Sequence, residues 1–260
     1  MMNVLTIKDA TKVIHHEGIA ERTILDGVDL TIKKGDFVTV LGGNGAGKST
    51  LFNTVAGTLS LTSGRVELMG ETITHWNEEK RARYIARVFQ DPKMGTAPRM
   101  TVAENLLLAL KRGQKRRLSL RKMAAYHQHF FELCQQVGNG LEQHLDAPAG
   151  TLSGGQRQAL SLLMATVQRP ELLLLDEHTA ALDPKTAKQL MTLTDQRIKE
   201  EQLTCLMITH RMEDALRYGN RLIVLKKGRI YREFNAQEKE KLTLADLLLF
   251  FEEEEELAVL

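Results

Sequence analysis

Hydrophobic and polar positions follow two different periods along the chain. Apolar and polar residues alternate over residues 4–8 and 23–30, which is the period of half-buried strands. Short apolar runs over residues 85–89, 172–175 and 204–209 are typical of buried parallel strands. Helical spacing occurs over residues 49–58, 102–112 and 120–137. The pattern therefore predicts an α/β protein.

The order of these segments predicts a sheet domain with a helical insertion. A β-rich run over residues 36–41 leads into a glycine-rich segment, and residues 221–225 and 229–234 predict a hairpin around Gly228. Between about Asp91 and Gly150 the strand patterns disappear, so we expect a helical subdomain over about residues 91–165. Residues 243–251 predict a short amphipathic helix. The acidic run that follows, residues 252–256, is interpreted as a solvated, partly disordered tail.

Composition narrows the class of protein. The chain has 260 residues, of which 43% are hydrophobic, and this is enough for a substantial core. Thirty-five Lys and Arg against 33 Asp and Glu give a net charge of +2, which argues against a protein that coats nucleic acid. Cys134 and Cys205 cannot form a disulfide framework and do not suggest zinc. We find no signal peptide or membrane-spanning segment, so we expect a cytoplasmic protein, or one that reaches a membrane through a partner.

The first motif with chemical meaning is a phosphate-binding loop. It lies between a predicted strand and a predicted helix and matches G-x-x-x-x-G-K-S/T with Gly42, Gly43, Asn44, Gly45, Ala46, Gly47, Lys48 and Ser49. Glycines let backbone N–H groups surround an anion, and a helix N-terminus favours negative charge. Lys48 adds a positive charge for the phosphates, and Ser49 offers a hydroxyl to Mg²⁺. Together with the adjacent Thr50, the segment predicts nucleotide binding.

The second motif is a pair of carboxylates at the end of a buried strand. Asp176 and Glu177 directly follow the apolar run 172–175. Such a strand is the usual partner of a phosphate-binding loop, and Asp176 is suited to hold Mg²⁺. Glu177 points in a different direction and is suited to orient or polarise an attacking water. The alternative, a strand end that merely reaches solvent, is weaker because a phosphate-binding loop lies upstream.

A second candidate anion site opens a later helix. It consists of Ser153, Gly154, Gly155 and Gln156 within the sequence LSGGQRQ. Ser153 is suited to cap the helix or to donate its hydroxyl to a phosphate, and the glycines leave N–H groups exposed at the positive helix end. One nucleotide cannot be enclosed by both anion sites of the same chain. Two chains set head to tail solve this, so we expect a homodimer in which each helix covers the γ-phosphate bound by its partner.

With these motifs in this order, residues 3–234 resemble the nucleotide-binding subunits of ABC transporters. Gln90 matches the Q-loop glutamine, Asp183 the D-loop aspartate and His210 the switch histidine, while Ser153, Gly155 and Gln156 match the signature. The resemblance implies ATP hydrolysis with Glu177, His210 and Gln90 in catalysis, and Mg²⁺ on Ser49, Gln90 and Asp176. It also implies a P-loop NTPase (RecA-like) core with an N-terminal antiparallel β part and a helical insertion. The cassette would span residues 1–236, followed by a C-terminal helix and tail over 237–260.

A narrower resemblance concerns a group of bacterial importers. Residues 87–92, 95–98 and 176–184 are similar to that group, including His178 where most ABC proteins have proline. The resemblance implies a membrane permease, a substrate-binding lipoprotein, a place on the cytoplasmic face of the membrane, and tryptophan or tyrosine as substrate. An ABC exporter ATPase and a non-transport ABC ATPase are the alternatives. A DNA-repair ATPase is disfavoured because the gap between the motifs carries no sustained heptads, and a ribosome-binding factor because the chain holds one cassette.

Two features leave alternatives open. ABC subunits usually stack an aromatic side chain on adenine, but the aligned residue here is Ile14, with His15 or His16 as possible substitutes. A basic stretch in the helical insertion is interpreted as a solvated face or a site for anionic lipid headgroups. It comprises Lys111, Arg112, Lys115, Arg116, Arg117, Arg121 and Lys122. No aromatic residue interleaves it, so we do not expect a nucleic-acid partner.

Overall fold

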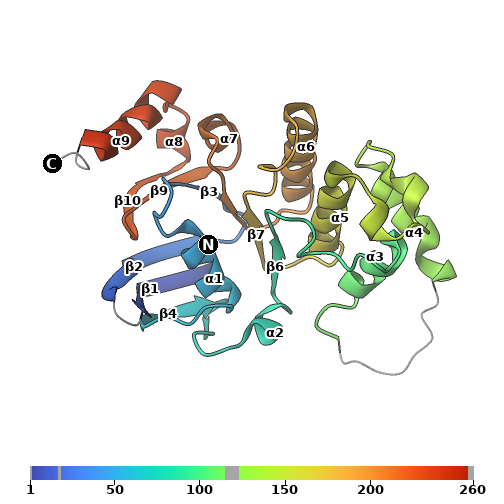
Figure 1. Ribbon diagram of the computed structural model, residues 1–260, viewed down its shortest axis with the longest axis horizontal. Helices are drawn as coiled ribbons and strands as arrows, with labels where there is room; N and C mark the ends of the chain where they lie inside the picture. The colour runs from blue at the N-terminus through green and yellow to red at the C-terminus, as the bar shows by residue number, and fades with distance from the viewer. Residues whose placement is uncertain (1, 17–18, 115–122, 257–260) are drawn as a thin grey trace. The chain divides into compact units, whose positions relative to one another are not determined.

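The computed structural model describes residues 2–16, 19–114 and 123–256 (Figure 1). The chain divides into two units, one formed by Met1–Arg81 with Thr204–Leu260 and the other by Ala82–Leu203. Among these described residues, the first unit holds an antiparallel sheet, parallel strands and five α-helices, and the second holds parallel strands and four α-helices. The predicted mixed α/β class with an antiparallel part is confirmed.

The antiparallel sheet of the first unit is built from the N-terminal strands. Its order is β2-β1-β4-β5, with β1 at Asn3–His16, β2 at Ile19–Lys33, β4 at Ser63–Leu68 and β5 at Glu71–Thr72. Leu5 pairs with Leu68, and Ile7 pairs with Leu30, so alternate positions bury one face of the sheet. The two predicted N-terminal strands are therefore present, but they are longer than the alternation indicates. Bulges in their pairing break the alternation of apolar and polar positions, so the sequence pattern reveals only part of each strand.

The same unit contains four strands in the order β10-β9-β3-β8. Their bounds are Phe37–Leu41 for β3, Cys205–Ile208 for β8, Arg221–Lys226 for β9 and Arg229–Phe234 for β10. Strand β3 pairs in parallel with β8 and β9, and β9 and β10 form the predicted hairpin. The helices of this unit are α1 at Lys48–Ala56, α2 at Glu78–Arg81, α7 at Met212–Arg217, α8 at Ala236–Lys239 and α9 at Leu244–Glu256.

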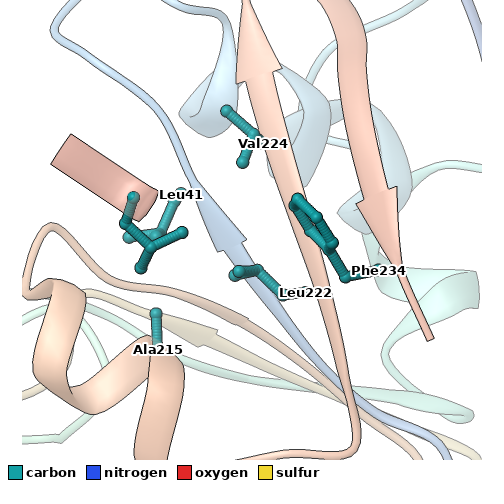
Figure 2. Packing of buried hydrophobic residues seen from close by; sticks show 6 residues of the cluster. Leu41, Ala215, Leu222, Val224 and Phe234 are labelled. Carbon is teal, nitrogen blue, oxygen red and sulfur yellow. The ribbon is translucent and has the colours of Figure 1, made fainter. Parts of the chain in front are cut away.

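The C-terminal helix α9 belongs to the core of the first unit. A buried cluster gathers side chains from β3, α7, β9, β10 and α9 (Figure 2): Leu41, Ala215, Leu222, Val224, Phe234 and Leu247. Phe250 packs against this cluster with its ring centroid 5.8 Å from that of Phe234. The helix also continues to Glu256, so the backbone of the acidic run is helical instead of forming the expected tail.

The second unit pairs β6 at Ile85–Val88 in parallel with β7 at Leu172–Asp176. Helices occupy the chain between these strands, as the sequence predicts (Figure 1): α3 at Val102–Leu110, α4 at Ala124–Gln135, α5 at Gly154–Thr166, and short 3₁₀ turns at Leu141–His144 and Ala149–Thr151. Helix α6, Pro184–Glu200, follows β7. None of the helices described is long and apolar enough to cross a membrane.

The basic stretch of the helical region is only partly described. Residues 115–122 lie outside the described chain, so the interpretation of that cluster stays a prediction. Arg112, which the sequence analysis assigns to a solvated face, is instead partly buried. Its guanidinium donates to the carbonyl of Gln168 at 2.7 Å, beyond the end of α5, and burial lowers its pKa. Arg112 therefore supports the C-terminal end of α5 through polar contacts.

Candidate nucleotide-binding site

The phosphate-binding loop connects β3 to α1 and requires glycine for steric reasons. Gly47 has φ 101°, and a Cβ there would lie 2.8 Å from the carbonyl oxygen of Ile24. A Cβ on Gly42 would lie 2.5 Å from the carbonyl oxygen of Leu225. Both distances are shorter than van der Waals contact, so the loop is fixed tightly against β2 and β9. The motif thus has the strand–turn–helix context that phosphate binding needs.

Lys48 organises this loop from inside. Its ammonium donates to the carbonyl oxygens of Gly42 at 2.6 Å and Gly43 at 3.0 Å, and the residue is 8% exposed. Asn44, Gly45 and Ser49 are exposed around it. The arrangement joins a fixed positive charge to the N-terminus of α1, which is the combination that attracts a phosphate group.

Arg81 supports the opposite end of α1, a role the sequence analysis does not foresee. Its buried guanidinium donates to the carbonyls of Thr54 at 2.6 Å and Val55 at 2.9 Å, in the last turn of that helix, and to Ile73 at 2.7 Å. Burial lowers its pKa to about 10. A cation at the negative end of a helix is stabilising, so Arg81 helps to hold the helix that carries Lys48.

His210 shares the edge of the parallel strands with the phosphate-binding loop. Strand β8 runs parallel to β3, with Val40 opposite Ile208, so both strands end at the same edge. Gly42 follows one strand and the exposed His210 follows the other. Ligands of open α/β sheets bind beyond this carboxyl edge. The first unit therefore brings together the phosphate-binding loop and the candidate switch histidine.

The second unit brings together Gln90, Asp176 and Glu177. Val88 pairs with Leu175, so the three residues lie at or just beyond the carboxyl ends of neighbouring parallel strands: Asp176 ends β7, Glu177 follows it, and Gln90 follows β6. Glu177 has φ 44°, a left-handed conformation that is uncommon for a residue with a side chain. Such outliers concentrate at functional sites. The backbone therefore supports the interpretation of Glu177 as more than a strand end.

The signature and D-loop residues lie together in the same unit. Ser153 Oγ accepts from the N–H of Gln156 at 3.3 Å in a capping box that begins α5. A Cβ on Gly155 would lie 2.5 Å from Thr186 Cγ2, so glycine permits close packing of α5 on α6. A cavity of about 520 Å³ is lined by Ser153, Gly154, Gly155, Gln156, Ala181, Leu182, Asp183 and Thr186, with side chains of α6 and of residues 137 and 139.

Asp183 has a structural role in addition to the one implied by the resemblance. Its carboxylate accepts from the N–H of Thr186 at 3.1 Å and caps α6. Hydrogen bonds from Thr186 hold the pKa of this carboxyl below its ordinary value. The side chain is therefore ionised at neutral pH, beside the N-termini of α5 and α6.

Two residues of α5 connect the signature helix to the segment around Gln90. Arg157 Nε donates to Thr96 Oγ1 at 2.8 Å, and Gln158 Nε2 donates to the carbonyl of Phe89 at 2.9 Å. Both side chains are buried. In the sequence, Arg157 and Gln158 are visible only as two polar residues after the signature, and the sequence does not show which residues they contact. Within the second unit, these two hydrogen bonds connect the segment around Gln90 to the helix that begins with the signature.

The residues proposed for Mg²⁺ fit that ion chemically. Ser49, Gln90 and Asp176 offer a hydroxyl, an amide and a carboxylate oxygen, and Mg²⁺ prefers oxygen ligands, keeping several waters. Among the described residues there is no group of three or more His, Cys, Asp or Glu side chains that could hold a metal ion.

The adenine contact is described only in part. Ile14 is half-buried in β1 and pairs with Arg22. The side chains of His15 and His16 lie outside the described part of the chain. The choice among these three residues stays a prediction.

His178 is buried directly after Glu177. Its Nε2 lies 3.1 Å from Thr194 Oγ1, and that hydroxyl donates to the carbonyl of Leu190 at 2.8 Å. The hydroxyl must therefore accept from the imidazole, which assigns the proton of the neutral ring to Nε2. Burial lowers the pKa of His178 to about 4. The neutral ring thus fastens the segment after Glu177 to α6.

This burial predicts acid sensitivity. The unfolded chain binds a proton at His178 below about pH 6.5, whereas the folded chain resists it until about pH 4. The free energy of unfolding is therefore unaffected by this group above pH 6.5 and falls below it, by about 2 kcal/mol at pH 5. Relative to wild type, His178→Gln should show a smaller loss between pH 7 and pH 5 in urea unfolding, because glutamine does not titrate. The exposed His75, changed to Gln, serves as the control and should leave the loss unchanged; an equal loss in His178→Gln would contradict the assignment.

Comparison with known proteins agrees with this geometry. The family model described as ABC transporter matches residues 25–180. The chain therefore belongs to the ATP-binding subunits of ABC transporters, a family of ATPases.

Individual relatives extend this result. The tyrosine transport ATP-binding protein of Clostridioides difficile (strain R20291) is 44% identical over 250 residues, which are 96% of this chain and 99% of the relative. The thiamine import ATP-binding protein of Shigella sonnei is 33% identical and covers 87% of this chain and 90% of its own. A dimeric ATP-binding cassette in a post-hydrolysis state, bound to ADP and Pi, has a TM-score of 0.76 and 28% identity, and the match covers 89% of this chain and 98% of the cassette.

Proposed function

We propose that this chain is the ATP-hydrolysing subunit of an importer for tyrosine, tryptophan or a related amino acid. The observation that carries the substrate class is the 44% identity, along nearly the whole of both chains, to a tyrosine transport ATP-binding protein. Relatives named for thiamine or spermidine/putrescine import are 33% and 34% identical. The higher identity therefore favours an amino-acid substrate.

Two copies of the subunit pair head to tail on the cytoplasmic face of the membrane. The pair acts on a permease, which receives substrate from a binding lipoprotein. Dimeric ATP-binding cassettes among the structural neighbours support the pairing. Contact with the permease is supported by exposed apolar side chains near the Q-loop and on α3, where Met94 is 70% exposed and Leu108 is 56% exposed.

Hydrolysis would follow from position and charge. Lys48 and the N–H groups of the loop hold the phosphates, while Glu177 orients the attacking water and His210 contacts the γ-phosphate, with Gln90 beside the site. Ser49, Gln90 and Asp176 hold Mg²⁺, which when bound neutralises phosphate charge. Ser153 and the N–H groups after it bind the γ-phosphate held by the partner subunit. Separation of like-charged products then opens the pair.

The substrate class is tested with the whole transporter in proteoliposomes. The binding lipoprotein loaded with tyrosine or tryptophan should stimulate ATP hydrolysis several-fold, and the same protein exposed to thiamine should not. Tyrosine should accumulate on the side of the membrane that carries the ATP-binding subunits. Stimulation by thiamine alone, or movement of tyrosine toward export, would overturn the proposal.

The head-to-tail pair predicts a specific effect of Ser153→Arg. Arginine at this exposed helix start adds bulk where the partner's γ-phosphate must fit, so ATP-driven dimerisation should be lost and hydrolysis should fall at least about tenfold. ATP binding to the monomer should persist. Light scattering after size-exclusion chromatography, in a Glu177→Gln background, measures the dimer. Thr192→Arg adds the same side chain at an exposed position of α6 and should dimerise normally; a dimer of Ser153→Arg would contradict the head-to-tail arrangement.

A further inference from the structure

Arg87 is a charged residue in a strand whose other members are buried and apolar. It stands third in β6, between the buried Ala86 and Val88. It pairs with Leu174 of β7, and alternate residues of a strand share a face, so Asp176 lies on the same face one step along. The register of the two parallel strands therefore directs Arg87 toward the carboxylate proposed to hold Mg²⁺.

The contact between the two side chains is close and shielded. Arg87 Nη2 lies 2.6 Å from Asp176 Oδ2, and the side chains are only 13% and 14% exposed. The guanidinium carbon also lies 4.7 Å from the ring centroid of Phe89, the residue directly after β6. Charge-assisted hydrogen bonds are strong, and solvent screens this pair less than a surface pair. The geometry holds the guanidinium at the carboxyl end of β7.

We infer that Arg87 is a built-in counter-ion of Asp176, which competes with Mg²⁺ for that carboxylate and raises the Mg²⁺ concentration needed for stable nucleotide binding. This inference rests on the proposed function of Asp176 as a Mg²⁺-binding residue. Without the ion, Arg87 gives the largely buried carboxylate of Asp176 a hydrogen bond and an opposite charge, which offset the cost of removing that carboxylate from water. With the ion, one carboxylate faces a monovalent and a divalent cation that repel each other. Arg87 thus acts through Asp176 as a positioning residue.

The competition predicts two effects of opposite sign in Arg87→Met. Without Mg²⁺, the variant should unfold at a lower temperature than wild type, because Asp176 loses its partner. Yet the Mg²⁺ concentration for half-maximal binding of a fluorescent ATP analogue should fall about 3- to 10-fold, because the carboxylate is released. Both proteins carry Glu177→Gln to prevent hydrolysis, and EDTA-treated samples are titrated with MgCl₂. A purely structural defect would lower stability and weaken Mg²⁺ binding together.

Matched variants isolate the charge. Arg87→Lys keeps a cation on the same strand and should stay within about twofold of wild type in its Mg²⁺ requirement. Arg65→Met breaks an exposed pair with Glu67, whose atoms lie 2.8 Å apart, and should change neither measurement. Arg87→Gln keeps a donor for Asp176 without the charge, so it carries the same expectation as Arg87→Met if the latter fails to fold.

Asp176→Asn separates this inference from the function on which it rests. If the Mg²⁺ requirement is unchanged in Asp176→Asn, the proposed metal site is wrong. If that variant needs more Mg²⁺ while Arg87→Met and Arg87→Gln need as much as wild type or more, the metal site stands and the competition is overturned. If Arg87 does act through Asp176, adding Arg87→Met to Asp176→Asn should have little further effect on the Mg²⁺ requirement, because both changes act on one interaction.

Discussion

Replacing Glu177 by glutamine should reduce ATP hydrolysis by about 100- to 10,000-fold while ATP binding persists. Glutamine keeps the size of the side chain but is a far weaker base, and a well-placed base or water-orienting group contributes this range. The backbone of Glu177 is held at φ 44° in a turn closed by the N–H of Ala180 at 2.9 Å. The substitution should leave that turn intact. Turnover is measured by phosphate release and binding by titration with Mg²⁺ and ATP.

The same variant should accumulate an ATP-bound dimer, because a pair that closes on ATP opens only after hydrolysis. Light scattering with and without ATP measures this accumulation. Glu171→Gln makes the same chemical change at an exposed position next to the opposite end of β7 and should hydrolyse ATP at the wild-type rate. Hydrolysis by Glu177→Gln at the wild-type rate would show that another group handles the water.

The nucleotide-binding part of the fold is the part that local sequence predicts best. The strand expected over 36–41 corresponds to β3, and the helix expected over 49–58 corresponds to α1. A glycine-rich turn between an apolar run and a helix is encoded within a few residues, so its signal is local. The end of α1 is local too, because Gly57 takes φ 87° there and closes the helix.

Elements that depend on distant partners escape such prediction. The pattern predicts no strand over β4, because SGRVEL is half exposed and becomes a strand through pairing of Leu68 with Leu5 and Val66 with Ile7. Helix α6 is also unforeseen, since polar residues dominate it and its apolar face is recognised only by what it buries, such as Leu190 and Ile198. Tertiary pairing decides both segments.

In the candidate site, too, the residues that belong to short motifs are predictable from the sequence, and the contacts between distant residues are not. Residue types and spacing are enough to nominate Lys48, Asp176 and Glu177, since each belongs to a short motif. The contacts around them join residues far apart in sequence. Arg87 meets Asp176 across 89 positions, and Gln158 meets the carbonyl of Phe89 across 69. Such contacts follow from strand register and helix packing, which one sequence does not specify, so the counter-ion of Asp176 emerges only from the structure.

Replacing Lys48 by alanine should weaken ATP binding by at least about 100-fold. The ammonium is the charged group inside the loop, and hydrogen bonds to charged partners contribute about 1.5 to 3 kcal/mol each, or roughly 10- to 100-fold in affinity. Alanine also removes the donor that holds the carbonyls of Gly42 and Gly43. The loop should therefore lose both its charge and part of its shape, and the two losses add in the same direction.

Thermal unfolding separates these losses. Without nucleotide, the shift in melting temperature reports what Lys48 contributes to the loop itself. With ATP present at 100 times the wild-type Kd, binding stabilises the wild-type protein by about 2.7 kcal/mol, whereas a variant with 100-fold weaker binding gains only about 0.4 kcal/mol. Lys34→Ala removes an exposed lysine just before β3 and should keep the full ATP-dependent shift. If Lys48→Ala also keeps that shift in the presence of Mg²⁺, the phosphates are bound elsewhere and the assignment of this loop is wrong.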